Sequence, residues 1–571
     1  MNSNNITGAE AFARALIAEG VDTVFGYPGG SNLPIYDAFY NHDKEIKHVL
    51  VRHEQGAVHA AEGYAEVSGK TGVCMVTSGP GATNLLTGIA DAMLDSIPVV
   101  CITGQVGVYS LGYDAFQETD VVGFSMPVTK WNYQITRADE IAETISKAFF
   151  IARSGRPGPV LIDITKNAQT EILDNFEYHK CNKIRSYHPR LKPKDDAIEE
   201  AAMLLNNSHR PLMIVGHGVL LSDCKDEIMQ LAQKIQMPVA STLLGLSAFP
   251  CDDPLYAGMV GLHGNLAPNK MTNECDVLLA VGMRFADRVT GNINKYARQA
   301  NIIHIEIDPS EIDKVVTTSV AIVSDAKSAL QKLAPKIQQS SHQQWIDKMY
   351  TYQRREQETV IANDLSKTSQ LLRMGRVVRA VSDLRKRNTI TVTDVGQNQM
   401  ASARYFDYRK DDQIVSSGGL GTMGFALPAS VGASLANQDK DIVCIMGDGG
   451  FQMTIEELGT IMQYKLPVKM VLLNNNYLGM IRQLQDLYYN KRYYFNELQN
   501  PDFVKIVDAY GIPARKVTSQ GELENAVSEM LTAQGPYFLE VQVEKDENVY
   551  PVIPAGAGVD ELLLGPNNTD N

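Results

Sequence analysis

The sequence predicts an α/β protein with parallel sheets, divided into about three domains. Its 571 residues exceed what one hydrophobic core serves, since single cores stop growing beyond roughly 250–300 residues. Short apolar runs alternate with helical patterns, which is typical of parallel sheets covered by helices. Several apolar runs end directly in a glycine-rich loop that opens a helix, an arrangement that suits phosphate binding.

Composition narrows the class of protein. A net charge of -14 argues against nucleic acid or an anionic membrane surface as partner. No stretch approaches the roughly 20 apolar residues of a membrane helix, and the polar start from Met1 to Glu10 resembles neither a signal nor a transit peptide. The seven cysteines form no CxxC pair, and Cys74, Cys101 and Cys444 stand in apolar runs. We therefore expect reduced thiols and a cytoplasmic location.

The first block covers residues 1 to about 180. It predicts a helix over 8–19 and strands over 21–25, 72–77 and 98–103. The polar, basic segment 174–195 is expected to be a linker.

A second α/β block follows over 197–333, with strands predicted at 212–215, 277–281 and 302–307. The Gln-rich stretch 335–369 is expected to form a helical connector. The third block starts at 374 and ends in a Pro/Gly-rich, acidic tail after Tyr550.

A candidate metal site lies in the third block. An apolar strand at 441–444 runs into Gly447-Asp448-Gly449, and a helix over 454–464 and a strand over 468–473 lead to three asparagines at 474–476. Carboxylate and amide oxygens at neighbouring strand ends suit a hard cation such as Mg²⁺, which takes its other ligands from phosphate and water. The alternative is an ordinary βαβ unit with common turn residues. The combination at this spacing favours the metal site.

Three loops of the first block carry further candidates. Glu54 follows a strand and opens a helix, where a carboxyl group can bond and activate a heterocyclic cofactor. The alternative is a carboxylate that only complements the helix dipole. A second glycine-rich loop spans 77–84, and a third, at 114–118, places an aromatic and an amide beside two acids.

The motifs together identify a family. They are FGYPGG at 25–30, HEQG at 53–56, TSGPGATN at 77–84, ITGQV at 102–106, DAFQE at 114–118, SGRPGP at 154–159, SGGLGTMG at 417–424 and the GDG/Asn pair. In this order, over essentially the whole chain, they resemble the acetohydroxyacid synthase (acetolactate synthase) large subunits among the thiamine diphosphate-dependent enzymes. The resemblance implies three doubly wound parallel-sheet domains: pyrimidine-binding over 1–180, FAD-binding over 195–340 and diphosphate-binding over 370–571.

The resemblance also implies roles for single residues. Glu54 would activate thiamine diphosphate, Phe116 and Gln117 would line the substrate side, and Lys166 would lie near the incoming 2-keto acid. From the residues alone, Lys166 is about equally well explained as a solvated lysine after a strand. The acceptor side would be lined by Met480 and Leu484.

For the cofactor, Met423 would support its bent conformation, and the carbonyl of Gly421 would accept a hydrogen bond from its amino group. The metal ligands would be Asp448, Asn475 and the carbonyl of Tyr477. The remaining implied contacts are Tyr27, Pro28, Pro80, Asn84, Val395, Gly396, Gln397, Asn398, Gly449 and Gly450.

The middle block gives a weaker signal. Arg284 and Arg288 follow a strand and can meet a pyrophosphate, and Glu306 with Asp308 suits ribose hydroxyls. The alternative is surface charge at strand ends, and the loop after 212–215 is only a fragment of a dinucleotide motif. The resemblance implies an FAD site that does no net redox work, with contacts from Arg156, Gly216, Gly218, Thr242, Leu243, His263, Gly282, Arg284, Arg288, Glu306, Ile307 and Asp325.

The implied activity is decarboxylation of pyruvate and condensation of the two-carbon unit with a second 2-keto acid, pyruvate or 2-oxobutyrate, in branched-chain amino-acid biosynthesis. A homodimer or a dimer of dimers is implied, with a small regulatory subunit as a further partner. Three alternatives stay open: a related carboligase with another acceptor such as a keto sugar, a flavin oxidase of the same fold, and an inactive relative with an assembly role.

Three positions depart from the family pattern. Leu484 stands where the family usually has Trp, which puts acceptor preference in doubt. Ala286 stands where Asp is usual, which puts FAD affinity in doubt. Asn398 stands where many members have His, and either side chain can donate to a phosphate oxygen.

Overall fold

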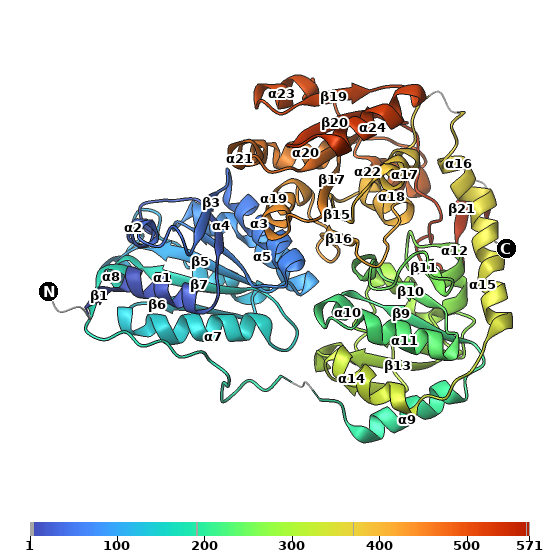
Figure 1. Cartoon of the computed structure of the whole chain (residues 1–571), viewed down its shortest axis with the longest axis horizontal. Helices are drawn as coiled ribbons and strands as arrows, with labels where there is room; N and C mark the ends of the chain where they lie inside the picture. The colour runs from blue at the N-terminus through green and yellow to red at the C-terminus, as the bar shows by residue number, and fades with distance from the viewer. Residues whose placement is uncertain (1–4, 190–191, 369–370, 567, 570–571) are drawn as a thin grey trace.

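The computed structural model describes residues 5–189, 192–368, 371–566 and 568–569 (Figure 1). Three α/β units each contain one six-stranded sheet. Every neighbouring strand pair in these three sheets is parallel, which confirms the predicted fold class. The expected boundary residues 1, 370 and 571 lie outside the described residues.

The first sheet has the strand order β3-β2-β4-β5-β7-β6. Its strands are β2 (Thr23–Gly26), β3 (Lys47–Leu50), β4 (Gly72–Val76), β5 (Val99–Gln105), β6 (Trp131–Ile135) and β7 (Val160–Thr165). Its helices are α1 (Gly8–Ala18), α2 (Leu33–Tyr40), α3 (Glu54–Ser68), α4 (Pro80–Asn84), α5 (Leu86–Asp95), α6 (Val121–Ser125), α7 (Ile141–Arg153) and α8 (Lys166–Thr170). A short antiparallel pair, β1 (Ile6–Thr7) with β8 (Ile172–Leu173), joins the two ends of the unit.

The middle sheet has the order β11-β10-β9-β12-β13-β14. Its strands are β9 (Pro211–Val215), β10 (Val239–Ser241), β11 (Tyr256–Met259), β12 (Val277–Val281), β13 (Asn301–Glu306) and β14 (Val320–Val323). Its helices are α9 (Asp195–Asn206), α10 (His217–Leu221), α11 (Lys225–Ile235), α12 (Leu266–Thr272), α13 (Asp287–Thr290) and α14 (Ala326–Leu333). The expected helical connector is present as α15 (Gln343–Glu356), a π-helical turn at Gln357–Ile361 and α16 (Ala362–Asp364).

The third sheet has the order β16-β15-β17-β18-β20-β19. Its strands are β15 (Thr389–Thr393), β16 (Gln413–Ser416), β17 (Asp441–Gly447), β18 (Lys469–Asn474), β19 (Ala514–Val517) and β20 (Tyr537–Gln542). Its helices are α17 (Met374–Leu384), α18 (Gln397–Tyr405), α19 (Ala426–Ala436), α20 (Asp448–Met453), α21 (Leu458–Tyr464), α22 (Gly479–Tyr488), α23 (Phe503–Ala509) and α24 (Leu523–Thr532). A final hairpin pairs β21 (Leu563–Gly565) with β22 (Asn568–Thr569).

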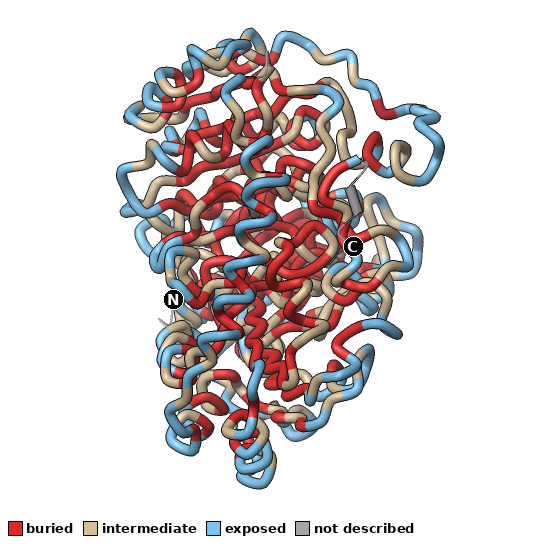
Figure 2. The backbone as a smooth tube through the Cα atoms, turned by 90° about the vertical axis from the view of Figure 1, so that its right-hand side faces the viewer, coloured by how far each residue is buried: buried red, intermediate tan, exposed pale blue. Residues whose placement is uncertain are grey.

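Alternate residues of a strand point to opposite faces of the sheet, so each sheet contributes side chains to a core on both of its faces. In β4, Val73 and Met75 pack with one core and Cys74 and Val76 with another. The second of these cores is shared with the third sheet, so the first and third units have one continuous interior. Figure 2 shows buried backbone through the middle of the molecule and exposed segments around its outside.

Helices α3 and α19 cross at the centre of that shared core. A Cβ at Gly432 would lie 1.8 Å from the carbonyl oxygen of Ala60, and one at Gly63 would lie 2.1 Å from the carbonyl oxygen of Ala429. Both positions therefore require glycine, because the two helix backbones touch. This crossing places the first turn of α3, with Glu54, against the third unit.

One expectation differs from the structure. The single helix predicted at 454–464 is divided: α20 (Asp448–Met453) begins at the Gly-Asp-Gly turn, where an acidic residue complements the helix dipole, a 3-10 turn follows at Ile455–Glu457, and α21 begins only at Leu458. The tail after Tyr550 packs against the middle unit, since Ile553, Val559 and Leu562 are buried in the core of that unit. All seven cysteines are free, as expected. In the described part of the chain, no helix is both long and apolar enough to cross a membrane.

Candidate active site

Glu54 is the first residue of α3, and its carboxylate is held from the next loop. The Asn84 side chain donates to Glu54 Oε2 over 2.9 Å. A Cβ at Gly81 would lie 3.4 Å from Glu54 Oε1 and 2.8 Å from the Thr77 methyl group, so glycine keeps the space beside the carboxylate. The structure thus brings together two of the predicted residues, and among the described residues no hydrogen bond is formed to Oε1, which faces Gly81 of the 77–84 loop.

The loop that carries Phe116 and Gln117 lies against the same place. A Cβ at Gly79, where φ is +57°, would lie 2.9 Å from the Gln117 Cβ atom. Gln117 and Asp114 both have positive φ, at 59° and 53°, a backbone strain that is often found at functional sites. Glu118 holds this turn, because its carboxylate accepts the N–H groups of Gly112 and Ala115.

The base of this loop is held by Gln105, which sequence reasoning did not single out. Its amide accepts from Val106 N at 2.9 Å and donates to Thr119 O at 3.0 Å, so one side chain joins the two ends of the loop. The buried Asp163 accepts a further bond from Gln105. Lys166 is exposed at the start of α8, and its neighbour Asn167 accepts from Val108 N.

The first unit exposes several large apolar side chains. Phe116 is 88% exposed, and the other exposed large apolar side chains of the same unit include Tyr27, Leu33, Tyr109, Tyr113 and Met126. Pro28 and Pro80 are exposed as well. Apolar groups gathered at a polar centre usually mark a contact surface.

Asp448 and Asn475 lie at the ends of adjacent strands in the third unit. Asp448 is buried, and burial raises its pKa to about 6. The Asn475 side-chain oxygen accepts from Tyr477 N at 3.0 Å, and its amino group donates to Gln397 Oε1 at 3.3 Å. An amide oxygen retains a second lone pair for another partner.

Asn500 joins these two strand ends and was missed from the sequence. Its amino group donates to Asp448 Oδ2 at 2.6 Å and to Asn474 Oδ1 at 3.1 Å. It lies in an irregular segment before α23, and no motif surrounds it. Only the fold brings it to the candidate metal ligands.

The loop after β15 faces the same turn. Asn398 is buried against Gly447, where a Cβ would lie 3.1 Å from its amino group. That amino group donates to Val395 O at 3.2 Å, while the side-chain oxygen has no hydrogen-bond partner. Gly421, with φ of +74°, lies beside Val395, and the Met423 methyl group lies beside Gly449.

A cavity of about 1020 Å³ lies between the middle and third units and also contacts α5 and the Arg153–Pro157 segment. Most middle-block candidates line it: Arg156, Gly218, Thr242, Leu243, His263, Gly282, Arg284, Arg288, Glu306, Ile307 and Asp325. From the third unit it includes Val395, Gly396, Gly421, Met480 and Leu484.

Charged groups line this cavity and are held by neighbouring residues. Arg284 donates to Leu94 O at 2.9 Å, and Arg156 lies 3.3 Å from both Asp308 and Glu311. Burial raises the pKa of Glu306 to about 7. A polar ligand with an anionic centre and hydroxyl groups would suit this set.

Several middle-block candidates also have structural roles. A Cβ at Gly218 would lie 2.7 Å from the Gly282 Cα atom, so these glycines let two loops pack together. Gly216 serves the same contact and is not part of the cavity lining. Asp325 caps α14 by accepting from Ser328 N. Arg288 is largely exposed beside Asp287.

The candidate residues for thiamine diphosphate fall into two groups, one at Glu54 in the first unit and one at Asp448 in the third unit. The cavity lining contains none of Glu54, Asn84 or Gln117, and the hydrogen bond given for the Glu54 carboxylate comes from its own unit. These statements cover the residues that the structure describes. We call the group at Glu54 and the group at Asp448 two half-sites.

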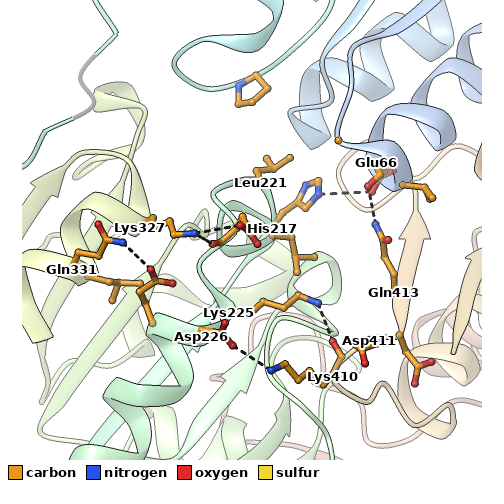
Figure 3. Close-up of a pocket in the computed structure, with 18 of the residues that line it drawn as sticks. Glu66, His217, Leu221, Lys225, Asp226, Lys327, Gln331, Lys410, Asp411 and Gln413 are labelled. Carbon is orange, nitrogen blue, oxygen red and sulfur yellow. Dashed lines mark hydrogen bonds and ion pairs between the residues drawn. The ribbon is translucent and has the colours of Figure 1, made fainter. Parts of the chain in front are cut away.

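A second crevice, of about 1330 Å³, lies where the three units meet (Figure 3). It contains none of the predicted site residues, and its charges pair with one another. Lys327 lies 3.3 Å from Asp223, Lys410 lies 3.4 Å from Asp226, and Lys225 donates to Lys410 O. We interpret this crevice as a solvent-filled gap between units.

Comparisons with known proteins agree with this division of the chain. Three family models match: the N-terminal TPP binding domain of thiamine pyrophosphate enzymes over residues 6–124, the central domain over 198–333 and the C-terminal TPP binding domain over 394–541. A probable acetolactate synthase large subunit of Methanocaldococcus jannaschii is 43% identical over 97% of this chain and 95% of its own length. The isozyme 2 large subunit of Escherichia coli K12 is 42% identical over 98% of this chain and 99% of its own. The large subunit of Haemophilus influenzae is 40% identical over 98% of both chains.

The chain belongs to the acetolactate synthase large-subunit family of thiamine pyrophosphate enzymes.

The residues present fit the cofactor of this family. Asp448 and Asn475 offer the oxygen ligands that Mg²⁺ prefers. Asn398 is a buried amide beside the Gly-Asp-Gly turn, and its side-chain oxygen, which has no partner in the described part of the chain, can accept one further hydrogen bond there. Glu54 is a fixed carboxylate with one open oxygen on the other half-site. The interdomain cavity has the size and the convergent polar groups of a nucleotide cofactor site.

Proposed function

We propose that this chain is the catalytic subunit of an acetolactate synthase. It would decarboxylate pyruvate and join the two-carbon unit to a second 2-keto acid, pyruvate or 2-oxobutyrate. The observation that carries the proposal is the similarity to large subunits over nearly the whole chain, with Glu54, Asp448 and Asn475 all present.

Thiamine diphosphate, when bound, supplies the electron sink that makes loss of CO₂ from a 2-keto acid possible. Glu54 would hold or transfer a proton at its open oxygen Oε1, while Asn84 fixes Oε2 and so fixes the direction of that proton. Gln117 and Phe116 would position the 2-keto acid beside it and keep water away. Lys166 would lie at the entrance, because its side chain is exposed beside the base of the 106–119 loop.

Asp448, Asn475 and the carbonyl of Tyr477 would hold Mg²⁺, and Asn500 would orient the Asp448 carboxylate. A cation there would lower the pKa of Asp448, which burial raises to about 6 without one. Gly449 and Gly450 would leave room for the diphosphate, together with Val395, Gly396, Gln397 and Asn398. Met423 and the Gly421 carbonyl would support the other end of the cofactor.

The interdomain cavity would hold FAD. Arg284 and Arg156 would face its diphosphate, and Glu306 a ribose hydroxyl. Ala286 lines the cavity, and its methyl side chain cannot form a hydrogen bond with the cofactor. We keep the division into a pyrimidine-binding domain (1–180), an FAD domain (195–340) and a diphosphate-binding domain (370–571).

A homodimer would complete the site. The two half-sites would then face each other across two copies, and the exposed apolar side chains of the first unit would be buried against the third domain of the partner. The relatives are called large subunits, so a small regulatory subunit is a further proposed partner.

The test is a product assay with pyruvate, thiamine diphosphate, Mg²⁺ and FAD, run with and without oxygen. Acetolactate without oxygen uptake is the expected result. Oxygen consumption would favour a flavin oxidase, and decarboxylation without acetolactate would favour a different acceptor such as a keto sugar. An absence of any turnover or cofactor binding would favour an inactive assembly protein.

A further inference from the structure

One fully buried carboxylate of the third unit has no role so far. Asp394 follows directly after β15 and is 1% exposed. Its backbone N–H donates to Ile445 O at 2.9 Å, which fixes the residue beside β17. No motif of the sequence singles it out.

In the described part of the chain, the hydrogen bonds to the Asp394 carboxylate all come from backbone N–H groups. Oδ1 accepts from Val395 N at 2.8 Å, and both oxygens accept from Gly424 N at 3.1 Å. Oδ2 also accepts from Ala426 N at 3.2 Å. Three N–H groups converge on one side chain, so this position requires a group that only accepts.

These donors belong to two loops that are far apart in the sequence. Val395 starts the loop that leads to Gln397 and Asn398, and Gly424 ends the loop that contains Gly421 and Met423. The Gly450 Cα atom lies against the same carboxylate, since a Cβ there would be 2.2 Å from Oδ1. Asp394 therefore contacts all three segments that would surround thiamine diphosphate.

Both loops contain glycines with positive φ, a conformation that leaves the backbone free to move until other contacts hold it. Gly396 has φ of +126°, Gly421 of +74° and Gly424 of +89°. Glycine-rich loops lose much conformational entropy when they become ordered. Because a single buried acceptor holds both loops, they become ordered when the protein folds and not when the cofactor binds. The cofactor then does not have to offset the entropy lost in this ordering, and it binds more tightly.

We propose that Asp394 is a positioning residue that holds the 395–398 and 421–426 loops in their cofactor-binding arrangement before thiamine diphosphate arrives. The proposal rests on the proposed function, because it concerns the same site. It predicts that both loops depend on one side chain, although they are separate in sequence.

The test uses full-length Asp394→Asn protein without cofactor. Asparagine has the same shape but turns one acceptor into a donor that faces backbone N–H groups. Two measurements are made: titration calorimetry with thiamine diphosphate at saturating Mg²⁺, and hydrogen exchange of the peptides that contain 395–398 and 421–426. We expect an affinity at least about 10-fold weaker and faster exchange in both peptides together, with β17 still protected.

The matched control is Asp412→Asn, a second buried aspartate of the same unit. Its carboxylate accepts from Thr389 N, Arg409 N and Arg385, and it touches neither loop. It should destabilise the unit without a selective effect on the two peptides. Equal loss of affinity in both variants, or general exchange across the whole sheet, would show that Asp394 serves stability alone.

A milder variant covers the case in which Asp394→Asn does not fold. Thr454→Val removes the bond from Thr454 Oγ1 to Gly424 O, at 2.8 Å, and leaves Asp394 in place. We expect a loss of affinity below about threefold and no change at 395–398. A collapse of binding in this variant would show that Thr454, and not Asp394, holds the loop. Wild-type protein that binds no thiamine diphosphate would instead contradict the proposed function itself.

Discussion

At the scale of single residues, the proposed chemistry depends on side chains whose orientation other side chains fix. Asn84 holds one oxygen of Glu54, Asn500 holds one oxygen of Asp448, and Gln105 closes the loop that carries Gln117. Each of these bonds limits one functional group to one direction, which favours reaction by lowering the entropic cost of alignment.

Replacing Glu54 by Gln should reduce turnover by a factor of about 10² or more, because the amide cannot transfer the proton. Asn84 would then face an amide in place of a carboxylate. The fold and the binding of thiamine diphosphate should remain largely intact. Steady-state acetolactate formation and calorimetry measure the two effects. The control is Glu143→Gln, on the exposed face of α7. Activity within twofold of wild type would remove Glu54 from its role.

Replacing Asp448 by Ala should weaken the binding of Mg²⁺ and thiamine diphosphate together, because the metal bridges the protein and the diphosphate. Calorimetric titration of each ligand is the measurement, with Asp439→Ala, at an exposed turn of the same unit, as control. Unchanged affinity for both ligands would contradict the metal assignment.

The side chain of Leu484 is expected to influence which 2-keto acid serves as the acceptor. It lines the interdomain cavity together with Met480 and is 40% exposed, so the pocket is open at this wall. A leucine cannot offer the flat face of the usual tryptophan, and such a contact with one methyl group changes selectivity by only about 1–3 kcal/mol. We expect little preference between pyruvate and 2-oxobutyrate, and a shift toward 2-oxobutyrate in Leu484→Trp.

Competition between the two acceptors at equal concentration measures this preference as the ratio of the two products. A strong bias toward acetohydroxybutyrate in the wild type that is unchanged in Leu484→Trp would mean that other residues, such as Met480, close the pocket.

At the scale of elements, the contact between α3 and α19 sets the position of the first half-site. Glycine at 63 and 432 lets the helix backbones touch, and the buried alanines around them add no bulk. The start of α3 is also bonded to the third unit, since Glu457 accepts from the N–H groups of Arg52 and His53. Glu54 is thus positioned by a domain to which it does not belong.

Gly432→Ala should destabilise the protein, although alanine is the better helix former. The new Cβ would lie 1.8 Å from Ala60 O, and relief of such overpacking typically costs about 1–3 kcal/mol. Thermal unfolding should show a lower midpoint together with reduced acetolactate formation. Gly521→Ala, where a Cβ meets open space, is the control and should leave both unchanged. An unaltered midpoint in Gly432→Ala would mean that the helices can move apart freely.

At the scale of the whole molecule, a group of buried acids lies where the three units meet. Glu62 and Glu66 come from α3, and Asp91 and Asp95 from α5. Burial raises the pKa of all four, to about 7 for Asp91 and about 6 for Asp95.

The groups that face these acids do not neutralise them fully. His59 lies 2.9 Å from Glu62, and burial lowers its pKa to about 3, so it is neutral. His217 lies 3.8 Å from Glu66, and burial lowers its pKa to about 4. The third unit contributes the Ser417 hydroxyl, which donates to Asp91 Oδ1, and Gly418 N, which donates to Asp95. Arg284 and Arg156 favour the charged form of Asp95 alone.

These shifts make stability depend on pH. Asp91 has a raised pKa in the folded protein, so between about pH 4 and 7 the folded state keeps a proton that the unfolded state has lost. The free energy of unfolding therefore falls as pH rises through this window. Asp91→Asn is uncharged at every pH and should unfold at a higher temperature than wild type at pH 8, with a smaller difference at pH 5.

Thermal unfolding at both pH values tests this, with the exposed Asp43→Asn as control. A difference between Asp91→Asn and wild type that is independent of pH would show that Asp91 keeps one protonation state throughout.

Much of the fold could be predicted because its signals are local. The strands β4, β9 and β12 begin and end within a residue of their predicted bounds, since apolar β-branched runs are contiguous in the sequence. The motifs at strand ends also predicted which side chains gather at one edge of a sheet. Asp448 and Asn475 are an example, because their strands β17 and β18 are neighbours.

The sequence by itself thus determined the three parallel sheets, the family and the residue types of both half-sites. Only the tertiary structure decided which side chains hold them in place. Asn500 reaches Asn474 across 26 positions, Asp394 reaches Ala426 across 32, and Ser417 reaches Asp91 across 326. Local patterns encode elements because they act through the spacing of neighbouring residues, whereas these contacts exist only after distant segments have packed together.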